Sequence, residues 1–271
     1  MKIASLQPSI SLVLDELGCL DALVACTRYC LAAVPALRGR GLTVVRDSWS
    51  TGADELLAVR PDLVIASVPY RNESLAAILK AGCPVLTLAP HSLADIEQDI
   101  RLIAMVTGAG VRAEEIIGGM RAAVDEVRRR TSVVAHKPLV YCEEWGKPLI
   151  HSQLWVRELV EAAGGVFLGE PGSVTTAEAV AEADPDVILA AWCGAGDRVP
   201  LEKLAVRPGW ERIRAIRDGR LYCIDDELLN TPAPTLVQGL RAIANVLHPD
   251  LFGTTGGIRA LDPSRSTTGC V

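Results

Sequence analysis

One long helix, predicted over residues 113–130, constrains the fold of this chain more than any other feature. Apolar residues recur there at steps of three and four, at Ala113, Ile116, Ile117, Met120, Val124 and Val127, which places them on one side of a helix. Glutamates stand in the first turn and three arginines in the last, where the helix dipole favours anions and cations respectively. The helix would span roughly 27 Å at about 1.5 Å per residue. Because the chain before and after it has a similar pattern, we expect a strut that joins two lobes.

Short apolar strands alternate with helices on both sides of this strut. Continuous apolar runs stand at Ile3–Leu6, Leu23–Thr27, Leu63–Ser67 and Val85–Leu88 before it, and at Leu139–Cys142, Val187–Ala191 and Leu221–Ile224 after it. Such runs are typical of strands buried on both faces of a parallel sheet. Residues 28–51 are expected to be rich in loops. The pattern predicts an α/β fold of two Rossmann-like lobes with parallel sheets, joined by one long backbone helix.

The predicted boundaries follow from these elements. An N-terminal α/β lobe covers residues 1–110, the connecting helix 111–132, and a C-terminal α/β lobe 133–252. Residues 253–271 are rich in Gly, Thr and Ser, and we expect a flexible tail there. Residues 55–66 and 178–190 share one order of features, which is a helix, a Pro-Asp turn and a buried strand. This echo supports two related lobes, although one short match is weak evidence of a repeat.

Composition excludes several classes of protein. The chain has 271 residues, of which 49% are hydrophobic, and no apolar run is long enough to cross a membrane. A net charge of −6 with scattered Lys and Arg argues against nucleic acid as a partner. Eight cysteines without a CxxC pair indicate neither a disulfide scaffold nor an ordinary zinc site.

The first residues resemble a strand and turn rather than a leader, so we expect a cytoplasmic chain as written, or a periplasmic or extracellular one if a leader has been removed.

Ligands of open parallel sheets sit beyond the carboxyl ends of the strands, so candidate binding residues are those that follow each apolar run. Five Trp, four Tyr and two Phe are the whole aromatic content, yet several fall at these positions, where rings could line a cleft for a large ligand. Rings that cover the core at strand ends are the alternative. The candidates are Pro8, Ser9, Tyr29, Cys30, Trp49, Ser67, Tyr70, His91, Glu144, Trp145, Trp192, Cys193 and Asp226.

Two other kinds of chemistry have weaker support. His91 with Cys30 or Cys193 could hold a metal ion, but the chain has only four histidines, and no metal site is predicted. Cys193 could serve as a nucleophile, although no histidine has a context that would make it the base. We predict no catalytic residue and no obligatory cofactor.

Motifs in order along the chain resemble one family. These are IASLQPSISLVLDELG, LVACTRYC, ELLAVRPDLVIAS, AGCPVLTL, YCEEWGKPL followed by WVRELVEAAGG, RPGWERIRAIRDGRLYCIDDELL and LVQGLRAIANVLHPDLF. Over roughly residues 3–252 the sequence resembles the helical-backbone substrate-binding proteins of ABC importers that serve cobalamin, iron-siderophores and haem. The CEEW-x-KPL segment is most similar to chains described as cobalamin-binding.

The resemblance implies a non-enzymatic protein that holds a corrinoid in the cleft between two lobes. Trp49, Tyr70, Trp145 and Trp192 would stack on the ligand, and Ser67, Glu144 and Asp226 would make polar contacts. An iron-siderophore, haem or metal-ion ligand is the alternative, with Tyr29, Cys30, His91 and Cys193 as candidate ligands; a further alternative is a cytosolic enzyme that acts on a cofactor precursor. The resemblance also implies docking on an ABC permease, for which Glu73 and Glu202 are the candidate carboxylates.

Overall fold

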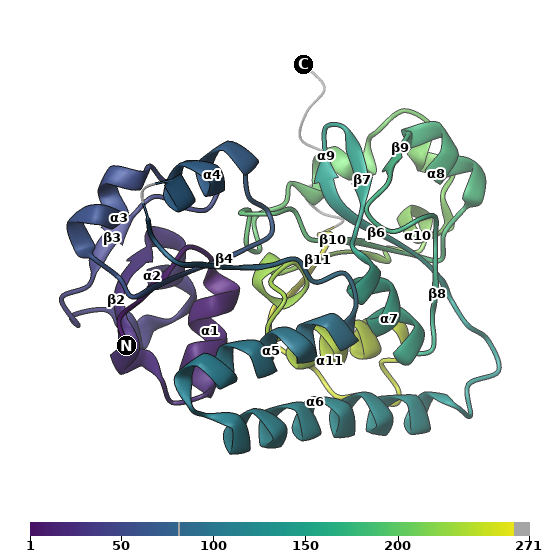
Figure 1. Cartoon of the computed structure of the whole chain (residues 1–271). Coiled ribbons are helices and arrows are strands. Elements are labelled where there is room, and N and C mark those ends of the chain that lie inside the picture. Colours follow the sequence, from purple (N-terminus) through teal and green to yellow (C-terminus); the bar gives the residue numbers. More distant parts are fainter. Residues whose placement is uncertain (81, 263–271) are drawn as a thin grey trace. The chain divides into compact units, whose positions relative to one another are not determined.

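The structure, a computed structural model, describes residues 1–80 and 82–262, which fold as two compact α/β units (Figure 1). Unit 1 comprises Met1–Met120 with Pro232–Pro234, and unit 2 comprises Arg121–Thr231 and the described residues from Thr235 onward. Each unit has one β-sheet of its own. The predicted α/β class with two Rossmann-like lobes is confirmed.

Sheet A of unit 1 is entirely parallel, as predicted, in the order β3-β2-β1-β4-β5. This is the order of a doubly wound fold, in which the chain adds strands outward from β1, first on one side of it and then on the other. The elements are β1 (Ile3–Ser5), α1 (Pro8–Glu16), η1 (Leu20–Ala22), β2 (Leu23–Thr27), α2 (Arg28–Ala33), η2 (Pro35–Leu37), β3 (Thr43–Val45), α3 (Ala53–Val59), β4 (Leu63–Ser67), α4 (Asn72–Lys80), β5 (Val85–Leu88) and α5 (Leu93–Thr107).

Sheet B of unit 2 is mixed, which corrects the expectation of a second parallel sheet. Its order is β12-β11-β10-β6-β7-β9, with β8 beside β6; the central β11, β10 and β6 are parallel, and β12, β7 and β9 add antiparallel pairs. The elements are β6 (Leu139–Gly146), β7 (Leu149–His151), α7 (Leu154–Ala162), β8 (Val166–Phe167), β9 (Val174–Thr175), α8 (Ala177–Ala183), β10 (Val187–Ala190), α9 (Leu201–Ala205), η3 (Trp210–Arg212), α10 (Arg214–Arg217), β11 (Leu221–Ile224), η4 (Asp226–Leu228), α11 (Leu236–Leu247) and β12 (Ile258–Ala260).

The long helix α6 (Gly110–Thr131) forms where the apolar periodicity predicts it. Ala113, Ile116, Ile117, Met120 and Val127 of the predicted stripe are buried. Val124 is half-buried. The division between the units falls inside this helix, after Met120. One helix therefore belongs to both units.

Three segments differ from the sequence prediction. The supposed loop 28–51 contains α2, which is capped by the Thr27 side chain, and the edge strand β3. Strand β6 continues to Gly146, so Glu143, Glu144 and Trp145 belong to the strand rather than to a following loop. The expectation of a flexible tail after residue 252 is wrong for Ile258–Ala260, which pairs with β11, while residues 263–271 lie outside the described part.

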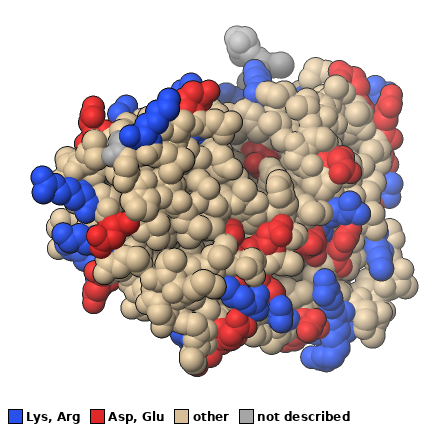
Figure 2. All heavy atoms as spheres, in the orientation of Figure 1, with Lys and Arg blue, Asp and Glu red and all other residues tan. Residues whose placement is uncertain are grey.

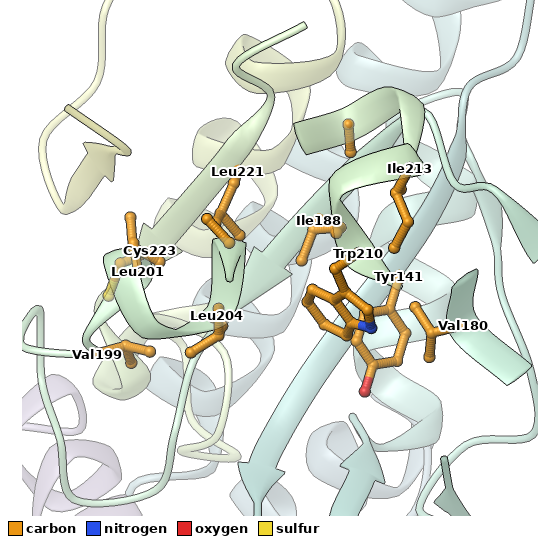
Figure 3. Close-up of a cluster of buried hydrophobic side chains, with 13 residues drawn as sticks. Tyr141, Val180, Ile188, Val199, Leu201, Leu204, Trp210, Ile213, Leu221 and Cys223 are labelled. Atoms are coloured by element: carbon orange, nitrogen blue, oxygen red, sulfur yellow. The ribbon is translucent and has the colours of Figure 1, made fainter. Parts of the chain in front are cut away.

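One cluster of buried hydrophobic side chains in unit 2 packs around Tyr141 and Trp210 (Figure 3). Tyr141 and Trp210 are its largest fully buried side chains, and their rings meet edge to face with centroids 6.1 Å apart. Aliphatic side chains from β10, α9 and β11 surround them. Burial of this many apolar groups is the main term that stabilises such a domain. It also fixes β6 and β10, whose carboxyl ends carry candidate site residues.

Charged residues of both signs are interspersed on the face drawn in Figure 2. Within residues 1–80 and 82–262, no helix is long and apolar enough to cross a membrane.

Candidate functional site

The carboxyl edge of sheet A, called edge 1, carries two exposed aromatic rings. Edge 1 is defined by Tyr29, which follows β2, Trp49, which follows β3, and Tyr70, which follows β4. Tyr29 and Trp49 are 40% and 53% exposed, and Tyr70 is half-buried against the core of unit 1. Flat rings at the carboxyl edge of a parallel sheet are suited to contact a ligand. The parallel order of the strands brings all three predicted residues to one edge.

Arginines accompany both exposed rings of edge 1. The Arg28 guanidinium lies over the Tyr29 ring, 4.7 Å from its centroid, and its Nη2 donates to the Tyr29 hydroxyl at 2.7 Å. Arg71 lies over Trp49 with its guanidinium carbon 5.8 Å from the centroid. Such cation–π contacts restrain the rings and leave a face of each available.

A pocket of about 420 Å³ opens beside Tyr29. It is lined by Thr27, Arg28, Tyr29, Val44, Val45, Arg46, Asp47, Ser50 and Glu55. Arg46 is paired with Glu55, and Asp47 accepts from the backbone N–H groups of Trp49 and Ser50 at 3.2 and 3.0 Å. Arg28 and Arg46 were not among the predicted binding residues. Arg46 directly follows β3, a strand that was not predicted, whereas Arg28 follows the correctly predicted β2.

Three predicted binding residues of unit 1 are buried, which corrects their assignment. Cys30 is fully buried, with its sulfur 3.2 Å from the Thr27 hydroxyl and 3.7 Å from that of Ser5. Ser9 and Ser67 are 5% and 1% exposed. These small groups fill space between the sheet and its helices, so in this structure their side chains are not open to a ligand.

Pro8 and His91 have local structural positions. Pro8 is half-buried at the first position of α1, where its missing N–H costs nothing. His91 is exposed and precedes α5, and its backbone N–H donates to Asp95 Oδ2 at 3.0 Å. Among the described residues, no group of three or more His, Cys, Asp or Glu side chains is arranged to hold a metal ion.

The carboxyl edge of sheet B, called edge 2, brings together residues from three parallel strands. Edge 2 is defined by Glu144 and Trp145 at the end of β6, Trp192 and Cys193 after β10, and Asp226 after β11. Trp145 is 44% exposed, and its Nε1 donates to the Lys147 carbonyl at 2.9 Å. All five residues were predicted from the sequence to follow strands.

Carboxyl groups and one thiol meet at edge 2. The Cys193 Sγ donates to Glu144 Oε1 at 3.6 Å, and Gln153 Nε2 donates to the other oxygen at 2.8 Å. Asp226 accepts from the backbone N–H groups of Gly194 and Gly196 at 2.6 and 2.8 Å. Burial raises the pKa of both Glu144 and Asp226, and these hydrogen bonds oppose the rise only in part.

The surroundings of Cys193 do not favour a nucleophile. Loss of hydration, followed by the carboxylates of Glu144 and Asp226, raises the pKa of the thiol well above its usual value. A thiol acts as a nucleophile only when it is ionised. Edge 2 therefore lacks the electropositive environment that the enzyme hypothesis needs at this cysteine.

Trp192 is held from two sides. Its Nε1 donates to Oε1 of the buried Glu143 at 2.9 Å. A Cβ at Gly146 would lie 2.4 Å from Cζ2 of the indole, so the ring rests directly on this glycine. Glu143 directly follows the predicted strand Leu139–Cys142, but of the two neighbouring glutamates only Glu144 was predicted as a binding residue.

The two candidate docking carboxylates differ in exposure. The Glu73 side chain, in the first turn of α4, is 80% exposed and lies 3.8 Å from Arg71 Nε. Glu202 is half-buried in the first turn of α9. Glu73 is thus the more accessible of the two.

Comparison with known proteins decides the family. The family model described as "Periplasmic binding protein" matches residues 3–228. The chain belongs to the periplasmic binding protein family. Its match to this family agrees with the motifs noted in the sequence, and ABC-importer substrate-binding proteins are the functional class to which such chains belong. These proteins bind small ligands and are generally not enzymes.

The relatives of this periplasmic binding protein do not all have the same ligand in their names, and some have none. An uncharacterized ABC transporter substrate-binding lipoprotein of Bacillus subtilis, YvrC, is 25% identical over 93% of this chain and 81% of its own length. A cobalamin-binding protein of Halobacterium salinarum is 24% identical over 91% of this chain and 69% of its own. A periplasmic heme-binding protein of Pseudomonas aeruginosa shares the fold, with a TM-score of 0.84 and 24% identity, over 96% of this chain and 98% of its own.

Proposed function

We propose that this periplasmic binding protein binds a corrinoid of the cobalamin type and delivers it to an ABC permease. Edge 1 would supply Trp49 and Tyr70 as stacking groups, and edge 2 would supply Trp145 and Trp192. The relative from Halobacterium salinarum whose name is cobalamin-binding supports this ligand.

The main support for the proposal is that the exposed aromatic side chains lie at strand ends, whereas aromatic side chains elsewhere are buried. Among the described residues, the exposed Phe, Tyr and Trp are Tyr29, Trp49 and Trp145, and all three lie at or after the carboxyl ends of strands. Other aromatic side chains, such as Trp155, Trp210 and Phe167, are buried. Keeping rings in water at strand ends has a cost unless a ligand covers them.

The polar groups of edge 2 favour a corrinoid over haem. A corrin ring carries carboxamide groups at its periphery, which donate hydrogen bonds, whereas haem carries two propionates. Glu144 and Asp226 accept hydrogen bonds when ionised and would repel a propionate. A ligand that is rich in N–H donors therefore matches edge 2 better than an anionic one does.

Titration of the purified chain with cyanocobalamin tests this function. We expect one molecule to bind with a dissociation constant in the micromolar range or below, measured by calorimetry and by quenching of tryptophan fluorescence. Trp49→Ala and Trp145→Ala should each weaken binding by about tenfold, which corresponds to roughly 1.4 kcal/mol of lost stacking. Trp155→Phe, in the core, is the matched control. Absence of heat and quenching at high micromolar ligand would refute the corrinoid proposal.

Haem is the second candidate, and Tyr29 is the residue that favours it. The residue is 40% exposed and its hydroxyl accepts a hydrogen bond from Arg28. Tyrosine is one of the side chains that can ligate haem iron. Titration with haemin should then give a charge-transfer band that Tyr29→Phe abolishes. Binding of cyanocobalamin without any haemin spectrum would decide against this candidate.

Docking on a permease would take place outside the cytoplasm, because the family is of a periplasmic or extracellular type. Glu73 would be the carboxylate of unit 1 that meets the permease, and Glu202 that of unit 2. Reversal of charge at Glu73 should lower uptake of labelled cyanocobalamin in cells without changing the affinity of the purified chain. Unchanged uptake in both Glu73→Lys and Glu202→Lys would exclude these two residues.

A further inference from the structure

We propose that Glu143 is a positioning residue, which together with Arg207 fixes the Trp192 indole as a rigid stacking face at edge 2. This inference rests on the proposed function, in which Trp192 contacts the ligand. Glu143 itself touches no ligand, because its side chain is fully buried.

All four hydrogen bonds that the Glu143 carboxylate needs are present. Arg207 donates from both terminal nitrogens, from Nη1 to Oε2 at 2.5 Å and from Nη2 to Oε1 at 2.8 Å. The Tyr141 hydroxyl donates to Oε2 at 3.0 Å, and Trp192 Nε1 donates to Oε1 at 2.9 Å. A buried carboxylate is tolerated when it is paired and fully hydrogen-bonded. The indole N–H is thus tied to a charged group with very little freedom to move.

Arg207 is itself held in place. Its guanidinium carbon lies over the Trp210 ring, 4.6 Å from the centroid, and its side chain is only 15% exposed. Trp210 is fully buried and donates from Nε1 to the Ala177 carbonyl at 3.1 Å. The chain of contacts therefore runs from the core of unit 2 outward to Trp192.

Gly146 supplies the second constraint on the ring. Three atoms of the Trp192 indole lie within 3.0 Å of the position that a Cβ of residue 146 would occupy. Only a glycine permits this approach. One hydrogen bond at Nε1 and one flat contact on the ring together set the orientation of the indole.

The strand geometry is of the kind found beside binding sites. The pairing of β6 with β7 shifts register between Glu143 and Trp145, so that Glu144 is an extra residue in the ladder. Such a bulge changes the direction of side chains and is frequent next to functional residues. Here the Glu143 side chain is buried, and that of the next residue, Glu144, is half-exposed.

Stability alone does not account for this arrangement. A buried ion pair contributes little net stability compared with apolar residues of the same volume, since both charges lose their hydration. What the pair does provide is a fixed acceptor for the indole. A ligand then meets a ring that needs no reordering, which lowers the entropic cost of binding.

The test compares variants that free the indole with matched variants that disturb the core elsewhere in unit 2. Glu143→Gln and Gly146→Ala should each weaken cyanocobalamin binding by about tenfold. The controls are Trp155→Phe, which removes an indole donor to the Leu229 carbonyl, and Gly165→Ala, which overlaps with core aliphatic groups. These should lower the melting temperature but leave the dissociation constant within about twofold.

An NMR measurement without ligand tests the positioning of Trp192 even if Glu143→Gln unfolds or the wild type does not bind cyanocobalamin. The chain has five tryptophans, so its indole N–H signals are few in a ¹⁵N–¹H spectrum. Loss of one signal in Trp192→Phe assigns it, and Gly146→Ala should shift and broaden that signal, whereas Gly165→Ala should not. If the shift occurs but the wild type does not bind cyanocobalamin, the proposed function fails and the positioning of Trp192 stands. If Gly146→Ala leaves both the signal and the affinity unchanged, the positioning role is wrong.

Discussion

At the scale of single residues, burial shifts the ionisation of one carboxyl group outside edges 1 and 2. Asp99 lies in α5, and burial, followed by the nearby Asp95 carboxylate, raises its pKa from 3.8 to about 7. The folded chain therefore binds this proton more tightly than the unfolded chain does. The free energy of unfolding contains a favourable contribution from Asp99 below pH 4, and that contribution is lost as the pH rises through about 7.

This shift predicts a stabilising substitution. Asp99→Asn removes the cost of a buried charge, so at pH 8 it should raise the free energy of unfolding by about 1–3 kcal/mol, with little effect at pH 4. Urea denaturation of wild type and variant at both values measures the difference. Asp15→Asn, at an exposed position of α1, is the control. An equal effect at pH 4 and pH 8 would contradict the assignment to Asp99 ionisation.

The sequence could predict which residues of the candidate site follow a strand, because that depends only on their position in the chain. Tyr29, Trp49 and Trp145 follow or end apolar runs, and the parallel strands bring them to the carboxyl edges. Whether each of these side chains is buried or exposed was not predictable from its position in the chain. Cys30 is as close to a strand end as Tyr29 is, yet it points inward, because hydroxyl groups of Ser5 and Thr27 offer it partners beneath α2.

At the scale of elements, the sequence echo corresponds to a shared structural device. Helices α3 and α8 each end at a non-glycine residue in the left-handed region, Arg60 and Asp184, which is followed by Pro-Asp and a buried strand. The Asp62 carboxylate accepts from the N–H of Lys2 at 2.6 Å, and that of Asp186 accepts from the N–H of Leu139 at 2.8 Å. Each aspartate thus ties the start of the first strand of its unit.

The two aspartates should differ in their contribution to stability. Asp186 is only 13% exposed and also pairs with Arg214 at 2.7 Å, whereas Asp62 is exposed. Asp186→Ala should lower the free energy of unfolding by about 2–3 kcal/mol, because it leaves a half-buried N–H and a guanidinium without their partner, and Asp62→Ala by less than about 1 kcal/mol. Denaturant titration of the pair measures both. Equal losses would show that burial does not decide the effect.

Strands were predictable where their apolar runs are continuous. Residues 23–27, 63–67, 85–88 and 221–224 form strands with the predicted bounds. Three of these strands are inside their sheets, and β5 is an edge strand. Strand β3 has two exposed residues of three, and β9 and β12 contain no fully buried residue. These strands exist because a neighbour offers a free ladder of hydrogen bonds, and a single sequence does not reveal which neighbour that is.

At the scale of the whole molecule, the proposed function requires ligand contacts from both units. Cyanocobalamin at one hundred times its dissociation constant should raise the free energy of unfolding by about 2.7 kcal/mol if it binds the folded chain alone. Hydrogen exchange should slow at residues 27–30 and 47–51 of unit 1 and at residues 192–196 and 225–227 of unit 2. Protection in one unit only would contradict the prediction that both lobes hold the ligand, while the peptide over α5 serves as an internal reference.

Strand β12 has a consequence for how copies of this protein behave toward each other in solution. It occupies the hydrogen-bonding side of β11, is three residues long, and carries Arg259, whose guanidinium donates to the carbonyls of Asp197 and Val199. Without it, β11 would offer a bare row of amide and carbonyl groups to any other chain, the condition under which sheets pair between molecules and aggregate. From this short, charged edge strand we expect low self-association at high concentration, which light scattering of the purified chain would measure.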